Sequence, residues 1–291
     1  MAIILGTLNE DNLEGLPEND IIQALDGNDI VRGREGNDII QGNLGNDVIY
    51  GDQGDDVIQG NEGNDQLFGG EGDDVIQGGA GNDRIWGDSG NDVLQGGAGH
   101  DTFRDSSGVN YFDGGEGRDT VTFQDLINSG IKLNLAEGTG SYTDEQNQEV
   151  AQTLISIEKA VGTNFNDELI GNEAHNNFFG LDGDDTITGG AGNDVINTGD
   201  GNNTIDSGSG LDTIQLGNGN NTIALEEGEG HDKVINFQQG LTRFGVSDAS
   251  TLTFEQSNGS VNIIAADGDL LANVEGVEVS TFTDNLSSIF F

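Results

Sequence analysis

The sequence predicts an all-β solenoid of stacked 18-residue coils with a β-hairpin near its C-terminal end. Three observations predict it. The first is a nine-residue period, with thirteen consecutive blocks from Gly6 to Thr122 and seven more from Gly162 to Ala224. The second is that every block has an apolar residue at its eighth position. The third is that residues typical of turns fill the first six positions, and glycine alone accounts for 49 of the 291 residues.

Each block is interpreted as one tight turn followed by one short strand. Blocks such as GGEGDDVIQ at 69–77 begin with glycine, asparagine and aspartate, which accept the backbone angles of turns. The last three positions alternate outward, inward and outward, which predicts a strand of about three residues. Two blocks complete one coil, and stacked coils form two parallel sheets whose eighth-position side chains meet inside.

The sixth position is aspartate in twelve of the first thirteen blocks. Turns 18 residues apart lie on the same side of the solenoid, about 4.8 Å apart, so these residues form two columns of carboxylates. Like charges at that spacing demand a cation. A cage of carboxylate and turn carbonyl oxygens suits Ca²⁺ better than Mg²⁺, and soft metals are disfavoured because the chain has no cysteine and no histidine cluster. The candidate calcium ligands are Asp11, Asp20, Asp29, Asp38, Asp47, Asp56, Asp65, Asp74, Asp83, Asp92, Asp101, Asp119, Asp167, Asp185, Asp194 and Asp212.

Asparagine at the sixth position keeps one oxygen but loses the charge. We therefore expect weak or empty sites at Asn110, Asn176, Asn203 and Asn221. Aspartate pairs on the same side number six on one edge of the first array, four on the other edge, and two in the second array. These pairs predict calcium ions on the order of ten, mostly in the first array.

The charge balance limits the partners. With 53 acidic and 9 basic residues the formal net charge is −44, which disfavours nucleic acid and anionic membrane surfaces. The composition alone also fits a disordered chain, but columns held in phase over thirteen blocks argue against disorder. No apolar run is long enough for membrane insertion, and the start MAIILGTLNED lacks the pattern of a cleavable export signal.

Two stretches fall outside the period. Residues 123–161 contain a predicted strand at 131–135, a polar loop at 136–149 and a second predicted strand at 153–161. After residue 235, two apolar segments joined by Asp267, Gly268 and Asp269 predict a hairpin that caps the open end of the solenoid. The expected domains are 1–122 (first calcium-binding array), 123–161 (β spacer), 162–235 (second array, with EGEGHDKVI at 227–235) and 236–291 (C-terminal cap).

The blocks resemble the GGxGxDxUx nonapeptides of RTX proteins, the hemolysin-type calcium-binding repeats, over about two-thirds of the chain. The resemblance implies a right-handed parallel β-roll in which the sixth-position aspartates and turn carbonyls ligate Ca²⁺. It also implies a chain that is unfolded at low cytosolic calcium, is exported by a type I secretion apparatus that reads the uncleaved C-terminus, and folds outside the cell. The tail TDNLSSIFF is similar to such a signal, with a plain capping strand as the alternative.

The blocks depart from the family pattern at position two, which is glycine in only four of the first thirteen blocks, at Gly70, Gly79, Gly97 and Gly115. We expect this difference to alter the turn geometry without removing the carboxylate.

No catalytic motif stands apart from the repeat. His100, His175 and His231 all occupy position five, where asparagine or aspartate is usual, so we expect them to substitute for asparagine. The leading hypothesis is a secreted, non-enzymatic calcium-binding protein that acts as a structural, matrix or cell-surface component. A surface polysaccharide or matrix is its expected further partner. The alternatives are a secretion and folding module of an extracellular enzyme, and a carbohydrate-binding adhesin.

Overall fold

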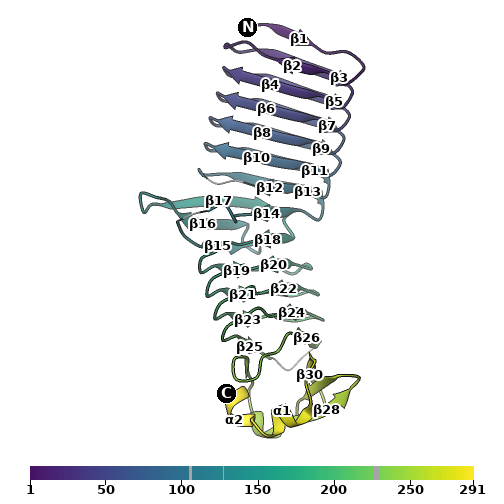
Figure 1. Ribbon diagram of the computed structural model, residues 1–291, viewed down its shortest axis with the longest axis vertical. Helices are drawn as coiled ribbons and strands as arrows, with labels where there is room; N and C mark the ends of the chain where they lie inside the picture. The colour runs from purple at the N-terminus through teal and green to yellow at the C-terminus, as the bar shows by residue number, and fades with distance from the viewer. Residues whose placement is uncertain (105–106, 127, 226–229) are drawn as a thin grey trace. The chain divides into compact units, whose positions relative to one another are not determined.

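The computed structural model describes residues 1–104, 107–126, 128–225 and 230–291. In these residues, short strands follow one another along the chain and almost no helix occurs (Figure 1). The chain divides into two compact units, of which the first comprises Met1–Asn128 and Gly138–Ala160 and the second Ser129–Glu137 and Val161–Phe291. None of the helices in the described part of the chain is long and apolar enough to cross a bilayer.

In the first unit, successive strands alternate between two sheets, and neighbours within each sheet are parallel and 18 residues apart. Ile22 is paired with Ile40, for example, and Ile49 with Leu67. This register confirms the predicted solenoid of 18-residue coils. One sheet has the order β1 (Ile3–Leu5), β3 (Ile21–Asp26), β5 (Ile39–Leu44), β7 (Val57–Glu62), β9 (Val75–Ala80), β11 (Val93–Gly99) and β13 (Tyr111–Gly117); the other has β2 (Asn12–Glu14), β4 (Ile30–Glu35), β6 (Val48–Gln53), β8 (Gln66–Glu71), β10 (Arg84–Ser89), β12 (Thr102–Arg104) and β14 (Thr120–Thr122).

The strands of the first array are longer than the sequence predicts. Strands β3 to β10 contain six residues each rather than about three. Pairing continues into the next block, where Leu25 and Asp26 are opposite Asn43 and Leu44. The parallel ladder therefore extends around the turn beyond the three alternating positions.

The core is a column of eighth-position side chains. Ile22, Ile40, Ile58 and Ile76 on one sheet are completely buried, as are their counterparts on the other. The alternation also places position nine outside, and Trp86 occupies such a position. Its ring stacks on Phe68 at 4.3 Å, and Phe68 stacks on Tyr50 at 4.8 Å, on the outer face of β6, β8 and β10.

The non-repeat stretch differs from its prediction in two places. The expected polar loop contains β16 (Thr139–Thr143), which pairs antiparallel with β17 (Glu149–Ile155) and buries Tyr142. The expected strand at 153–161 is split into β17 and β18 (Lys159–Val161), because Ser156 adopts a positive φ of 53° and turns the chain. Strand β17 pairs in parallel with β13, so it continues that sheet of the first unit.

The second unit repeats the solenoid with strands of three or four residues, close to the predicted length of about three. The strand expected at 131–135 is β15 (Ile131–Asn134), which pairs in parallel with β19 (Glu168–Ile170). One sheet then contains β19 (Glu168–Ile170), β21 (Thr186–Thr188), β23 (Thr204–Asp206), β25 (Thr222–Ala224) and β27 (Arg243–Gly245); the other contains β20 (Asn177–Phe179), β22 (Val195–Asn197), β24 (Thr213–Gln215) and β26 (Asp232–Ile235).

The predicted C-terminal hairpin is present as β29 (Ser260–Ile264) and β30 (Leu270–Glu275), which are antiparallel. Strand β28 (Thr253–Ser257) adds a third antiparallel strand, and β30 joins the solenoid by pairing in parallel with β26. A 3-10 turn at Ala249–Thr251 precedes β28, and the short helices α1 (Val279–Thr283) and α2 (Leu286–Ile289) follow β30.

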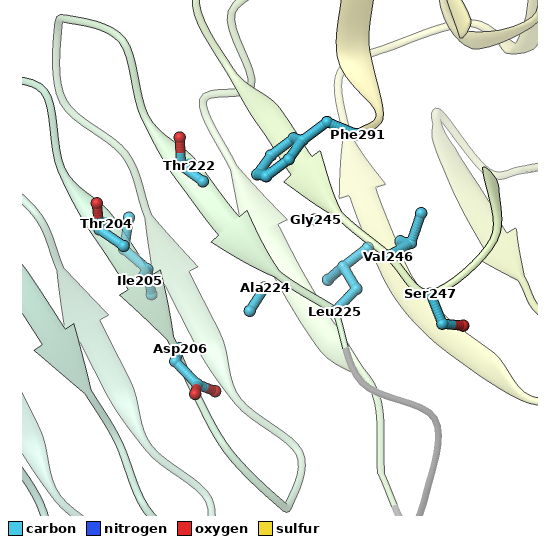
Figure 2. Close-up of a pocket in the computed structure, with 10 residues that line it drawn as sticks. All are labelled: Thr204, Ile205, Asp206, Thr222, Ala224, Leu225, Gly245, Val246, Ser247 and Phe291. Carbon is cyan, nitrogen blue, oxygen red and sulfur yellow. The ribbon is translucent and has the colours of Figure 1, made fainter. Parts of the chain in front are cut away.

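The last two residues attach the tail to β27. Phe290 is buried and forms a bridge with Phe244, whereas Phe291 lies on the outer face. Figure 2 shows the Phe291 ring beside Gly245, at the edge of an open hollow over β23, β25 and β27. A Cβ atom at Gly245 would lie 3.3 Å from this ring, so the glycine makes room for it.

Candidate metal centre

The sixth-position aspartates form continuous hydrogen-bonded columns. The Asp47 amide donates to Oδ1 of Asp65 at 2.8 Å, and the Asp65 amide donates to Oδ1 of Asp83 at 2.8 Å. The same contact recurs along both edges of the first array, and it joins Asp167 to Asp185 and Asp194 to Asp212 in the second unit. This confirms the prediction that turns 18 residues apart stack on one side.

The second carboxylate oxygen of most of these residues is buried without a partner. Asp65, for example, is 1% exposed, and its Oδ2 has no hydrogen bond among the described residues. A buried polar atom of this kind is costly unless something else satisfies it. Thirteen of the sixteen candidate ligands share this state: Asp29, Asp38, Asp47, Asp56, Asp65, Asp74, Asp83, Asp92, Asp101, Asp119, Asp185, Asp194 and Asp212.

The unpartnered oxygen faces further acceptors. A Cβ atom placed on Gly60 would lie 2.2 Å from Oδ2 of Asp65 and 2.7 Å from the carbonyl oxygen of Gly78 in the next coil. The carboxylate and this carbonyl therefore converge beside the position-one glycine, in space that any larger residue would fill. This close approach explains why position one is glycine in most blocks.

The turns with asparagine at position six show which groups surround this point. The Nδ2 amide of Asn203 donates to the carbonyl oxygens of Gly199 and Gly201 at 3.4 Å, and Asn221 makes the same contacts with Gly217 and Gly219. The asparagine amide thus satisfies the carbonyls of positions two and four. A carboxylate has no hydrogen to donate, so the aspartate turns gather acceptors only. Such a donor set fits a hard cation.

The raised pKa values of the buried aspartates also indicate a cation site. Desolvation raises the pKa of Asp56 and Asp65 to about 7, and it raises that of Asp74 to about 8, with neighbouring carboxylates adding to the shift. The amide hydrogen bond to each carboxylate lowers its pKa but does not outweigh burial. Ionised carboxylates in these columns therefore need a nearby positive charge.

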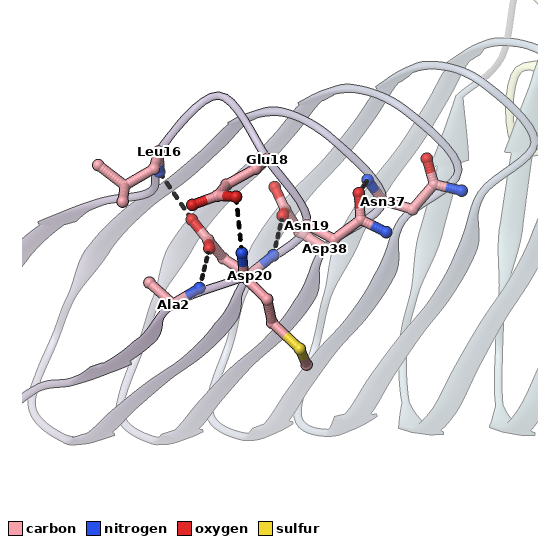
Figure 3. Close-up of polar contacts among 8 residues, drawn as sticks. Ala2, Leu16, Glu18, Asn19, Asp20, Asn37 and Asp38 are labelled. Carbon is pink, nitrogen blue, oxygen red and sulfur yellow. Dashed lines mark hydrogen bonds and ion pairs between the residues drawn. The ribbon is translucent and has the colours of Figure 1, made fainter.

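Asp11, Asp20 and Asp167 are arranged differently. Figure 3 shows both oxygens of Asp20 accepting backbone hydrogen bonds, at 2.6 Å from the Ala2 amide and 2.7 Å from the Leu16 amide. The Leu16 contact is the first cause of a lowered pKa at Asp20. In the same way, Oδ2 of Asp11 and of Asp167 accepts a hydrogen bond from the position-two amide of its own block.

Position four distinguishes these turns. Glycine at this position has a positive φ, such as 140° at Gly63, in a region that other residues rarely adopt. The blocks of Asp11, Asp20, Asp167 and Asn176 have Asn9, Glu18, Phe165 and Ala174 there instead, and all four turns direct the position-two amide at the sixth side chain. A residue other than glycine at position four therefore marks the turns whose sixth side chain accepts the position-two amide. The residue at position six alone does not show this difference.

Three residues outside the predicted set extend the columns. Glu158 accepts from the Asp119 amide at 2.9 Å, and Gln152 accepts from the Asn110 amide at 3.1 Å, so residues of the non-repeat stretch replace the missing sixth positions. Asp232 is buried at position six of EGEGHDKVI, accepts a hydrogen bond from Ser207, and has a pKa raised to about 7 by desolvation. The two-residue slip before that block conceals its place in the column.

Two of the three histidines at position five, His100 and His175, act as the sequence predicts. Nδ1 of His100 accepts from the Arg118 amide at 2.9 Å, and Nδ1 of His175 accepts from the Asn193 amide at 2.5 Å. Asparagines make this contact elsewhere, as when Asn64 Oδ1 accepts from the Asn82 amide. Among the described residues, no group of three His, Cys, Asp or Glu side chains has the arrangement of a metal site made by side chains alone.

Position two tolerates residues other than glycine with a modest change in backbone angle. The φ of Gly70 is 118° and that of Gly79 is the same, whereas Leu25, Arg34 and Asn43 have φ of 81° to 82°. All of these values lie in the left-handed region. The expected change in turn geometry is therefore a shift of φ within one region, and the carboxylate stays in place.

Stacked parallel coils with two columns of buried carboxylates define a nonapeptide-repeat β-solenoid with the donor set of a cation-binding protein. The sequence pattern of the RTX calcium-binding nonapeptide repeat matches this chain at residues 5–40, 32–67, 59–94, 86–121, 161–196, 188–223 and 197–232. These segments cover more than half of the chain, which therefore belongs to the RTX calcium-binding nonapeptide repeat family. Calcium is the ion that repeats of this family bind.

No curated protein matches the chain. Among solved structures, it is similar to the extracellular lipase LipA from Serratia marcescens, with 19% identity and a TM-score of 0.32. That match covers 81% of this chain and 43% of the lipase, so the chain spans less than half of the lipase's length.

Proposed function

We propose that this protein is a secreted, non-enzymatic calcium-binding β-roll that folds when it binds Ca²⁺ outside the cell. The observation that carries the proposal is the column of buried Oδ2 atoms without hydrogen-bond partners on stacked turns. A net charge of −44 opposes folding by self-repulsion, and bound calcium supplies the compensating positive charge.

The proposed ligands are the thirteen aspartates with an unpartnered Oδ2, together with carbonyl oxygens of positions one, two and four. In each turn the carboxylate fixes the preceding coil through Oδ1 and leaves Oδ2 for the ion, as at Asp65. The proposed set leaves out Asp11, Asp20 and Asp167, which the sequence also predicts, because their Oδ2 would have to give up a backbone hydrogen bond to coordinate an ion. The number of ions stays on the order of ten in this proposal.

The proposed role is structural, in a matrix or at a cell surface, with export by a type I secretion apparatus. Family membership supports calcium binding and agrees with secretion. The C-terminal strands and helices are proposed to cap the solenoid, because β30 covers the edge of β26 and Phe290 and Phe291 attach to β27. A surface polysaccharide stays a proposed further partner.

Small-angle scattering with and without calcium tests this function. In chelator we expect a radius of gyration approaching the roughly 60 Å of an unfolded chain of this length. Millimolar Ca²⁺ is expected to reduce it sharply, whereas the same concentration of Mg²⁺ is not. An unchanged radius in calcium would contradict folding on binding. A stoichiometric enzyme recovered with the protein from its native secretome would contradict the stand-alone, non-enzymatic role.

A further inference from the structure

On one sheet of the first unit, the outward positions seven and nine of six neighbouring strands carry no charged residue. Position seven of β1, β3, β5, β7, β9 and β11 and position nine of the same strands point outward, and none of these twelve residues is acidic or basic. We call them the uncharged face: Ile3, Ile21, Ile39, Val57, Val75 and Val93 in one column, and Leu5, Gln23, Gln41, Gln59, Gln77 and Gln95 in the other.

The uncharged face is regular and accessible. Ile39, Val57 and Val75 are 44%, 38% and 42% exposed, although they are large aliphatic residues. Beside them, the glutamines form a ladder in which Gln23 donates to Gln41 and Gln41 donates to Gln59, both at 2.8 Å. Gln59 donates to Gln77 at 3.4 Å, so the amides of three of the five glutamines are engaged along the ladder.

The opposite sheet shows that this composition is specific to one face. Its matching outward positions include Glu14, Arg32, Arg84 and Arg104, with an Arg32 guanidinium 4.2 Å from the Tyr50 ring. In a chain with 53 acidic residues, twelve neighbouring positions without charge are therefore a local exception. Contact with a partner would remove this exposed aliphatic column from water, which is favourable.

We propose that the uncharged face binds the same face of a second copy of this chain, forming a calcium-dependent dimer. The chain carries −44, and on the order of ten Ca²⁺ ions leave each folded copy with a net charge of about −24, so two copies still repel one another. This face is where they can approach without opposing charges. A two-fold axis along the strand direction places aliphatic column on aliphatic column and glutamine ladder on glutamine ladder. The face is thus complementary to itself, as an isologous interface requires.

The size of the face sets the strength of the dimer. Six coils at about 4.8 Å extend over about 29 Å, and two outward columns are about 10 Å wide, so each partner contributes about 300 Å². Stable interfaces bury about 1,200 to 2,000 Å² in total, which is at least twice as much. The dimer is therefore weak and forms at high protein concentration, such as that of a surface layer or matrix.

Sedimentation equilibrium of the full chain in calcium tests the proposal. Between roughly 10 µM and 1 mM, the weight-average mass is expected to rise from 30.4 kDa toward twice that value. The double substitution Val57→Glu with Val75→Glu is expected to abolish the rise. The matched control is Val48→Glu with Gln66→Glu, at the same block position on the other sheet, and it is expected to dimerise like the unmodified chain.

A second pair of variants avoids any effect of the added charge on folding. The chain has no cysteine, so Val57→Cys and Val48→Cys each introduce a single thiol. Oxidation in calcium is expected to cross-link Val57→Cys into dimers and to leave Val48→Cys monomeric. A chain that stays monomeric at every concentration, or equal cross-linking of both variants, would overturn the proposal. Circular dichroism of the same samples reports calcium-dependent folding separately, so failure of the dimer is distinguishable from failure of the proposed function.

Discussion

Replacement of Asp65 by asparagine separates a calcium ligand from a structural hydrogen bond. Oδ1 of Asp65 reaches the preceding coil, where the Asp47 amide donates to it, whereas Oδ2 lies beside the carbonyl of Gly78 in the following coil. The carboxylate therefore lies between the two neighbouring coils on its edge, where it can contribute to a calcium site on either side. We expect Asp65→Asn to reduce the number of bound calcium ions by two.

The size of the effect follows from mass action. At a free calcium concentration ten times the dissociation constant, each ion stabilises the folded state by about 1.4 kcal/mol, so the loss of two ions lowers the free energy of unfolding by about 3 kcal/mol. In chelator the same substitution is expected to stabilise the fold. It removes a buried carboxylate whose pKa is raised to about 7, and it supplies an amide donor like that of Asn203.

Asp20→Asn is the matched control. Both oxygens of Asp20 already accept backbone amides, from Ala2 and Leu16, so the substitution breaks one hydrogen bond without removing an unpartnered oxygen. We expect an unchanged calcium stoichiometry and, in calcium, a loss of about 1–3 kcal/mol in the free energy of unfolding. Isothermal titration calorimetry and chemical denaturation of the two variants measure these quantities. The reasoning is refuted if both substitutions remove the same number of ions.

Three further predictions follow from the same turns. In chelator, the raised pKa values of Asp56 and Asp74, about 7 and 8 against 3.8 in the unfolded chain, mean that the folded state binds more protons. The metal-free fold is thus most stable below about pH 4 and loses stability as the pH rises from about 4 to about 8, above which these groups are ionised in both states. Circular dichroism at several pH values measures this loss, and the opposite trend would contradict it. Leu25→Gly relieves a φ of 81° that costs about 1–2 kcal/mol. After the greater entropy of glycine in the unfolded chain is subtracted, we expect up to about 1 kcal/mol of stabilisation by denaturation in calcium, and a destabilised variant would count against strain at this position. Gly60→Ala places a Cβ atom 2.2 Å from Asp65 Oδ2, so calorimetry is expected to show lost calcium binding and denaturation a loss of about 1–3 kcal/mol; unchanged binding would exclude the close approach.

The repeated part of the fold follows from the period, because each block determines its own turn and strand. The buried series from Ile22 to Val121 and the stacked aspartates need only the nine-residue spacing. The extension of β3 through Leu25 and Asp26 does not follow from alternation, because a residue with positive φ interrupts the pattern while the ladder continues.

The remaining features depend on contacts between distant residues. Glu158 accepts the hydrogen bond from the Asp119 amide, 39 positions earlier, which a sixth-position aspartate would otherwise accept. Gln152 does the same for the Asn110 amide, 42 positions earlier. No local spacing predicts contacts over such distances. The split of 153–161 depends on a turn at Ser156 within a segment that otherwise alternates like one strand. The satisfied state of Asp20, by contrast, has a local cause in Glu18 at position four.

Far-UV circular dichroism during a calcium titration, with magnesium as the control, measures whether the β-solenoid requires calcium to fold. If buried carboxylates in the two columns require the ion, the chain in chelator at neutral pH has the spectrum of an unfolded chain. Millimolar Ca²⁺ then produces the β spectrum, and Mg²⁺ at the same concentration does not. A chain that is fully β-structured in chelator, and unchanged by millimolar Ca²⁺, would contradict the claim.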